Sequence, residues 1–212
     1  MSVLLAMPCY AGQMTVPAFF SIMSILEASQ RENIEVDVLV THGESAITRG
    51  RSNMASAFMR SRCDTLAFLD ADIGISGDDF FKLVKLDKPI RGAAVNVKTL
   101  DRTESLSCFK GGIRQIRANM PAEPFEVDYL GGSVMLIERD VIDQLSRLFA
   151  YLRYNDPIAG EGVHLFEEIV TGGALLSEDY AFCHRARDKA FTVWCDPSVI
   201  VSHYEGRVAW RF

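Results

Sequence analysis

The pattern of apolar and polar positions predicts strands and helices that alternate through the first half of the chain. Apolar runs at residues 2–7, 34–40 and 65–69 predict strands, and a segment with helical spacing or helix-start residues follows each, at 16–31, 46–60 and 76–86. Another strand is predicted at 89–97. Such alternation is typical of an α/β protein whose mainly parallel central sheet is flanked by helices.

In the second half the predicted strands cluster, which indicates a smaller antiparallel addition. Strand-like runs at 125–130 and 133–138 precede an amphipathic helix at 139–149, and Gly111-Gly112 predicts a hairpin turn upstream of them. A helix at 180–189 and two short strands, around 192–195 and 199–202, end the pattern. Residues 151–176 show little periodicity and contain four glycines, so we expect one long lid, binding loop or disordered segment there.

Composition narrows the classes of function. The 212 residues, 49% of them hydrophobic, suit one globular domain that spans 1–212. A net charge of −6 argues against broad binding to nucleic acid or to a membrane surface. We find no signal peptide and no run of transmembrane length, so we expect no membrane insertion. Five scattered cysteines without a C-x-x-C pair predict reduced thiols in a cytoplasmic protein and no structural zinc site.

The stretch Asp70-Ala71-Asp72 directly follows the apolar run at 65–69. If the strand continues, Asp70 and Asp72 point the same way, because residues two apart share a face. Two carboxylates held close together suit a hard divalent cation, which takes oxygen ligands. The alternative is an acidic turn that ends a strand.

Other candidates lie at predicted helix starts. Arg51 and its neighbour Arg49 stand in the first turns of a helix, where cations oppose the helix dipole, so we expect either an anionic ligand or a solvated helix face. Glu178 and Asp179 open the helix at 180–189, either as functional carboxylates or as capping residues. The loop after the first strand, Pro8-Cys9-Tyr10, lacks G-x-G-x-x-G, so the signal for a nucleotide is weak there.

In their order along the chain, these features resemble those of the nucleotide-diphospho-sugar glycosyltransferases of the GT-A fold. The resemblance covers most of the sequence and rests on these motifs: the Pro8-Cys9-Tyr10 loop, Arg49-Gly50-Arg51-Ser52-Asn53, the D-x-D motif Asp70-Ala71-Asp72, Gly131-Gly132 before an apolar strand, Glu178-Asp179-Tyr180, and the terminal His203. It implies transfer of a sugar from a UDP-sugar donor to a hydroxyl of a glycan or glycoprotein acceptor.

The resemblance also implies a role for each matched residue. Asp72 and His203 would bind Mn2+ or Mg2+, and Asp70 would hold the ribose or a metal-bound water. Asp179 would be the catalytic carboxylate near the anomeric carbon. The residues expected to bind the donor nucleotide are Pro8, Tyr10, Arg51, Asp70 and Lys98. Because His203 lies close to residue 212, the domain is expected to be part of a longer protein.

Three other functions stay open on the sequence. A haloacid-dehalogenase-type phosphatase would use Asp70 as its nucleophile, but in that class the motif usually continues to Thr or Val and lies near the start of the chain. Here Ile73-Gly74 follows, and more than sixty residues precede the motif. A nucleotide-sugar pyrophosphorylase would carry a Gly-rich signature that residues 8–12 lack. A non-catalytic sugar-nucleotide-binding or glycan-binding module can be excluded only by activity, although it would be unusual for such a module to keep Asp70, Asp72, Asp179 and His203 together.

Overall fold

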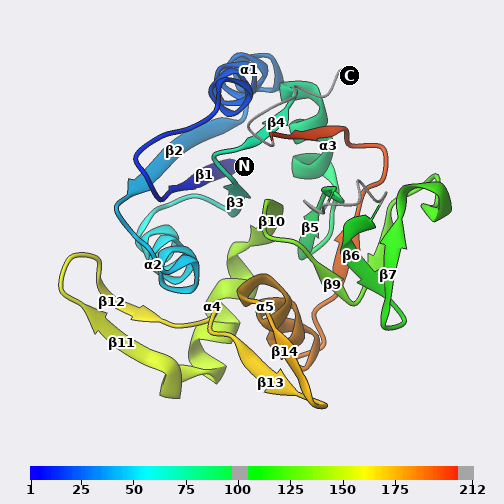
Figure 1. Cartoon of the computed structure of the whole chain (residues 1–212). Coiled ribbons are helices and arrows are strands. Elements are labelled where there is room, and N and C mark those ends of the chain that lie inside the picture. The colour runs from blue at the N-terminus through cyan, green and yellow to red at the C-terminus, as the bar shows by residue number, and fades with distance from the viewer. Residues whose placement is uncertain (97–104, 205–212) are drawn as a thin grey trace.

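The computed structural model describes residues 1–96 and 105–204, which fold around one seven-stranded sheet (Figure 1). Its strands are β1 (Ser2–Cys9), β2 (Glu35–His42), β3 (Thr65–Leu69), β5 (Ile90–Gly92), β8 (Phe125–Val127), β10 (Val134–Glu138) and β15 (Val193–Cys195). They lie in the order β2-β1-β3-β10-β5-β15-β8. The pairs β2-β1, β1-β3 and β5-β15 are parallel, whereas β10 and β8 run antiparallel to their neighbours. The predicted α/β class with a mainly parallel sheet is therefore confirmed.

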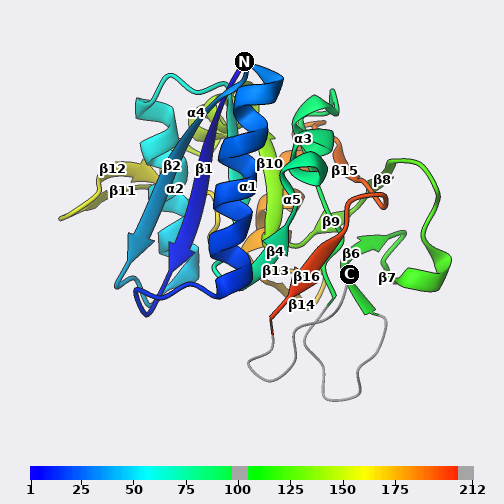
Figure 2. The same cartoon turned by 90° about the horizontal axis from the view of Figure 1, so that it is seen from above.

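Helices cover both faces of this sheet. They are α1 (Val16–Glu32), α2 (Ile47–Arg60), α3 (Gly77–Lys85), α4 (Arg139–Leu148) and α5 (Glu178–Arg187). Figures 1 and 2 show α1 and α3 on one face and α2, α4 and α5 on the other. Because successive strand residues point to opposite faces, Val3 and Leu5 of β1 pack in the core beneath α1, and Leu4 and Ala6 pack in the core beneath α2. The apolar runs of the sequence are continuous because both faces are buried.

Smaller sheets surround this centre. Strand β4 (Ile73–Ile75) pairs with β16 (Val201–His203), and β6 (Ser105–Lys110) pairs with β7 (Ile113–Ile116) and β9 (Tyr129–Leu130). There are also two 3-10 turns among the described residues, η1 (Arg117–Asn119) and η2 (Ala150–Leu152). The hairpin predicted at Gly111-Gly112 is confirmed, and both glycines have positive φ. Among the described residues, no helix is long and apolar enough to cross a membrane.

The expectation of one long loop at 151–176 is wrong. This stretch forms two hairpins, β11 (Arg153–Asp156) with β12 (Gly160–Val163) and β13 (Ile169–Thr171) with β14 (Ala174–Leu176). Strands of three or four residues are too short to show a periodicity. Gly172 and Gly173 occupy the turn between β13 and β14 at positive φ, and Gly160, the first residue of β12, also has positive φ. Gly162 instead lies in β12 against α2, where an added Cβ would approach Ser56 Oγ to 2.4 Å.

Two further expectations need correction. The strand predicted at 89–97 pairs within the central sheet only at β5, and Asn96 forms an isolated bridge to Leu106. Asp70 and Asp72 do not continue an extended strand, because the chain turns after β3 and Ile73 N–H donates to Asp70 O (3.1 Å). The turn is needed because the next strand, β4, leaves the central sheet to pair with β16.

Candidate functional site

Most of the sequence-predicted residues that the structure describes converge at the carboxyl ends of β1 and β3, although Asp179 lines neither of the cavities found there. A cavity of about 810 Å³ opens there, and among its lining residues are Pro8, Tyr10, Arg51, Asp70, Asp72 and Glu178. Open sheets of this kind commonly bind ligands beyond the carboxyl ends of their strands.

The smaller hollow beside it, of about 390 Å³, shares Asp70 and Asp72 with the larger cavity and adds His203 and Arg114. The Asp70-Ala71-Asp72 turn thus forms the wall between the two cavities.

His203 is brought to Asp72 by the pairing of β16 with β4. In this antiparallel pair His203 lies opposite Ile73, the residue after Asp72. His203 Nε2 lies 3.4 Å from Asp72 Oδ2, and Nδ1 lies 2.9 Å from the backbone oxygen of Asn96. If Nδ1 carries the proton, it donates to that oxygen, and Nε2 presents its lone pair toward the carboxylate. This arrangement is suited to a shared cation.

Asp72 and His203 by themselves meet only part of the coordination needs of a divalent cation. One carboxylate and one imidazole are acceptable ligands for Mn2+, and carboxylate oxygens are preferred by Mg2+. Within residues 1–96 and 105–204, however, no group of three or more His, Cys, Asp or Glu side chains is arranged to hold a metal. Of the described side chains, Asp72 and His203 would therefore supply only part of the ligands that such a cation needs.

Arg51 is the buried cation of the site. Its side chain is only 3% exposed, and its Nη2 and Nε lie 2.9 Å from Asp70 Oδ1 and 3.3 Å from Glu178 Oε1. Burial lowers the pKa of Arg51, but Asp70, Glu178 and Asp179 outweigh burial and raise it above its ordinary value. Arg51 is therefore charged at all working pH values. Its Nη1 is buried and makes no hydrogen bond within the described part of the chain.

Gly132 makes room for Arg51 and also contacts the helix start at α5. A Cβ at Gly132 would lie 3.0 Å from the guanidinium carbon of Arg51, so a larger residue would press on the buried cation. The Gly132 N–H donates to Asp179 Oδ2 (2.9 Å), while Asp179 Oδ1 accepts from Ser177 Oγ (2.5 Å) and Tyr180 N–H (2.8 Å). Both oxygens of Asp179 are thus engaged at the N-terminus of α5.

Glu178, which the resemblance did not assign a role, faces the larger cavity. Burial and then Asp179 raise the pKa of Glu178, and Arg51 opposes this shift. Burial outweighs the ion pair, because the Glu178 side chain is only 13% exposed and its carboxylate lies 3.3 Å from the Arg51 guanidinium. The only sequence signal was its place beside Asp179 at a helix start, where both acids are equally consistent with capping.

The remaining predicted residues divide into three groups. Pro8 and Tyr10 line the cavity, and the Tyr10 side chain is exposed. Lys98 lies outside the described residues. Arg49 is solvated and ion-paired with Glu44, so the alternative of a solvated helix face describes Arg49 and not Arg51. Arg114, a residue of β7, also lines the smaller hollow, and no sequence pattern indicated it.

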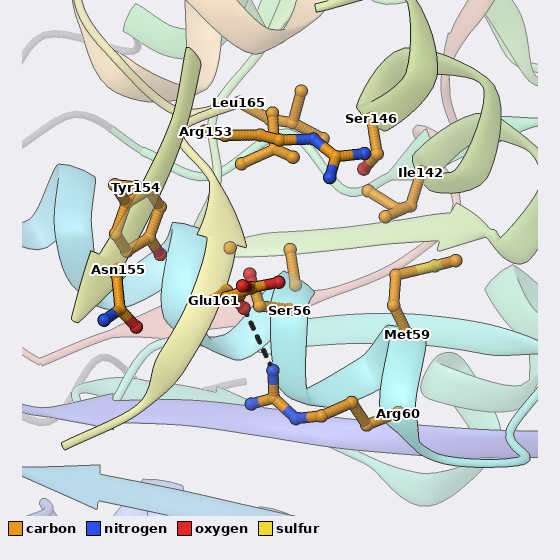
Figure 3. Close-up of a pocket in the computed structure, with 13 residues that line it drawn as sticks. Ser56, Met59, Arg60, Ile142, Ser146, Arg153, Tyr154, Asn155, Glu161 and Leu165 are labelled. Carbon is orange, nitrogen blue, oxygen red and sulfur yellow. Dashed lines mark hydrogen bonds between the residues drawn. The ribbon is translucent and has the colours of Figure 1, made fainter. Parts of the chain in front are cut away.

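A third cavity, of about 510 Å³, lies apart from these residues between α2, α4 and the β11-β12 hairpin (Figure 3). Met59, Ile142 and Leu165 give it apolar walls, and the Arg60 guanidinium donates to Glu161 O (3.2 Å) across it. It shares no lining residue with the cavity at Asp70 and Asp72. None of the sequence-predicted residues lies there.

Comparison of the sequence with family models and with curated proteins finds no match. Solved structures do match. A197 from STIV superposes with a TM-score of 0.60 at 17% identity, over 97% of this chain and 86% of that one. A mutant of Drosophila β1,4-galactosyltransferase 7, in complex with manganese, UDP-galactose and xylobiose, gives 0.53 at 12% identity, over 98% and 72%.

A third structure is a glycosyltransferase involved in glycosylation of the major capsid protein of PBCV-1. It superposes with a TM-score of 0.41 at 10% identity, over 74% of this chain and 68% of that one, which is too low to indicate a special relationship. At these identities the likeness concerns the fold alone. The chain has the GT-A fold of the nucleotide-diphospho-sugar glycosyltransferases.

Proposed function

We propose that this protein is a metal-dependent glycosyltransferase that moves a sugar from a UDP-sugar to a hydroxyl of a glycan or glycoprotein. The observation that supports this most is the pair of Asp72 and His203, 3.4 Å apart, beside the Asp70–Arg51–Glu178 network. A cation held by this pair would lie next to a buried fixed charge, at the mouth of a cavity large enough for a nucleotide. The glycosyltransferase fold is consistent with that chemistry.

Asp72 and His203 would hold Mn2+ or Mg2+, which neutralises charge on the leaving diphosphate when it is bound. Asp70 would accept hydrogen bonds from the ribose, and Arg51 keeps Asp70 in position through the 2.9 Å contact. Tyr10, exposed at the rim, offers an aromatic face to the uracil. Lys98 stays a proposed donor-binding residue.

Asp179 is our candidate for the carboxylate near the anomeric carbon, and Glu178 becomes a second. Asp179 is oriented by three hydrogen bonds, which suits a carboxylate that must be held in one position. Glu178 lines the cavity, and its raised pKa brings it closer to the range useful for general acid or base catalysis. Replacing each acid by its amide separates the two candidates.

The test is a thermal-unfolding experiment with UDP in the presence and absence of Mn2+. Ligand that binds only the folded state raises the melting temperature by mass action, so UDP should stabilise the protein only when Mn2+ is present. Asp72→Asn should lose that shift, whereas Asp78→Asn, an exposed acid paired with Arg31, should retain it. A shift with UDP that needs no metal, or one that survives Asp72→Asn, would refute the metal assignment.

A screen of UDP-sugars for slow hydrolysis, with Mn2+ and without acceptor, would then identify the donor sugar. A parallel assay with an aryl phosphate tests the phosphatase alternative, in which hydrolysis would depend on Asp70. Binding of UDP with Mn2+ but no turnover of any donor, with and without acceptor glycans, would favour the non-catalytic binding module.

A further inference from the structure

The cavity of Figure 3, between α2, α4 and the β11-β12 hairpin, has largely apolar walls. Its volume of about 510 Å³ is within the range of pockets that hold small organic molecules. Ala55, Ile142 and Leu165 line it from the main hydrophobic core, and Met59 and Val163 are partly buried beside them. These side chains offer almost no hydrogen-bonding groups, so a free sugar or an inorganic ion would gain little from them.

The hairpin is held against α2, which leaves this space between the hairpin and α4. Gly162 of β12 lies so close to α2 that an added Cβ would approach Ser56 Oγ to 2.4 Å. Arg60, the last residue of α2, donates to two backbone oxygens of the hairpin at 3.1 and 3.2 Å. Helix α4 contributes Ile142 and Ser146 to the lining. A ligand would therefore meet a largely preformed site.

The rim of the cavity carries more positive than negative charge. Arg60 and Arg153 are exposed there, and within the described part of the chain neither guanidinium makes an ion pair. Glu161 is the one acid among the described residues that line the cavity, and Asp143 of α4 is already paired with Arg147 at 2.5 Å. Two guanidiniums against one carboxylate favour an anionic ligand, although the whole chain has a net charge of −6.

We propose that this cavity binds an amphipathic monoanion, a small molecule with one carboxylate head and an apolar chain. The head pairs with Arg153, whose side chain Figure 3 shows extending toward Ser146. The apolar chain covers Ile142 and Met59 and removes them from water. One ligand thus supplies the counter-ion and fills the apolar space.

Other classes of ligand satisfy only half of this site. An inorganic anion or a sugar phosphate could pair with the arginines but would leave the apolar walls in water. A neutral lipid would cover the walls but leave both guanidiniums unpaired. Only a molecule with both parts complements both features.

Isothermal titration calorimetry of the full chain with decanoate, below its micelle concentration, tests the proposal. We expect one saturable site, and we expect Arg153→Gln to raise its dissociation constant about tenfold, because a hydrogen bond between charged groups is lost. Ser146→Glu should have a similar effect, because it places a carboxylate beside Arg153. Arg62→Gln is the matched control, because Arg62 is exposed two residues beyond α2 and is not among the lining residues.

Decanol separates the contribution of the charge from that of the apolar chain. An apolar cavity alone would favour decanol, whose head group is less strongly hydrated than a carboxylate. We therefore expect decanoate to bind more tightly than decanol, and Arg153→Gln to leave decanol binding unchanged. In methyl NMR spectra decanoate should shift the resonances of Ile142 and Leu165 and leave those of Ile25, in the core on the other face of the sheet, in place.

The side chains of Arg153 and Ser146 make no hydrogen bond within the part of the chain that the structure describes, so unchanged melting temperatures should show that both variants fold. Absence of saturable binding, decanol that binds as tightly as decanoate, or decanoate binding that both variants leave unchanged would overturn the proposal. So would methyl shifts confined to other surfaces, such as Val16 and Met23 on the exposed side of α1. The outcome is independent of whether the protein is a transferase.

Discussion

Replacing Arg51 by Met should destabilise the protein in a pH-dependent way. The substitution keeps a long apolar side chain over Phe68, whose ring centroid lies 5.0 Å from the guanidinium carbon, but removes the charge. Asp70 and Glu178 then keep their negative charges in a largely buried place without a counter-ion. The loss in free energy of unfolding is therefore the penalty for keeping those two carboxylates partly buried without a counter-ion.

The magnitude follows from the burial of the three side chains. Removing one partner of a buried ion pair usually costs about 3–5 kcal/mol. Asp70 is 24% exposed and Glu178 is 13% exposed, so solvent relieves part of the penalty, and we expect about 3 kcal/mol at neutral pH. For a chain of this length that loss lowers the melting temperature by about 6–12 °C.

The pH dependence has a definite sign. Burial and Asp179 already raise the pKa of Glu178, and loss of Arg51, which opposes them, raises it further. A carboxyl whose pKa is higher in the folded state than in the unfolded state costs stability as pH rises through the folded value. The deficit of Arg51→Met should therefore be largest at neutral and alkaline pH and should shrink as pH falls toward the unfolded value of about 4.3.

Urea unfolding of wild type, Arg51→Met and Arg51→Lys across this pH range measures the effect. Arg51→Lys retains the charge and should lose less stability. Arg49→Met is the matched control two residues away, because Arg49 pairs with Glu44 in solvent and should change stability little. A deficit in Arg51→Met that is below about 1 kcal/mol, or that does not shrink with falling pH, would refute the buried-charge account.

Three other substitutions give further tests. Gly92→Ala should cost about 1–3 kcal/mol by urea unfolding, because the new Cβ would lie 2.1 Å from Val134 O in the paired strand. Gly50→Ala should instead stabilise by about 0.5–1 kcal/mol, because the nearest atom to its Cβ is the flexible Glu44 side chain at 3.3 Å and alanine favours helix. Asp179→Asn should retain the shift with UDP and Mn2+ but lower turnover of the identified donor; loss of the shift would make Asp179 structural.

Much of the fold was already determined by local patterns in the sequence. The apolar runs predicted β1, β2 and β3, and the helices after them begin within a residue or two of the predicted positions. Ser76, at the start of the predicted segment 76–86, caps α3 by accepting the Asp79 N–H at 3.1 Å. These features depend on neighbours in the chain, so a sequence can show them. The short hairpins at 153–176 do not, because strands of three or four residues depend on what they pack against. Gly162 of β12, for example, lies too close to Ser56 of α2 to carry a side chain.

For the candidate site, the sequence determined which residue types stand at the ends of strands and the starts of helices. It indicated Asp70, Asp72, Arg51 and His203 as candidates, but it could not say which of them touch. Only the tertiary structure decided that Arg51 is buried between Asp70 and Glu178, that Asp70 and Asp72 lie in a turn, and that His203 meets Asp72. The reason is physical: these contacts join residues up to 131 positions apart, and packing of the whole sheet sets their distances.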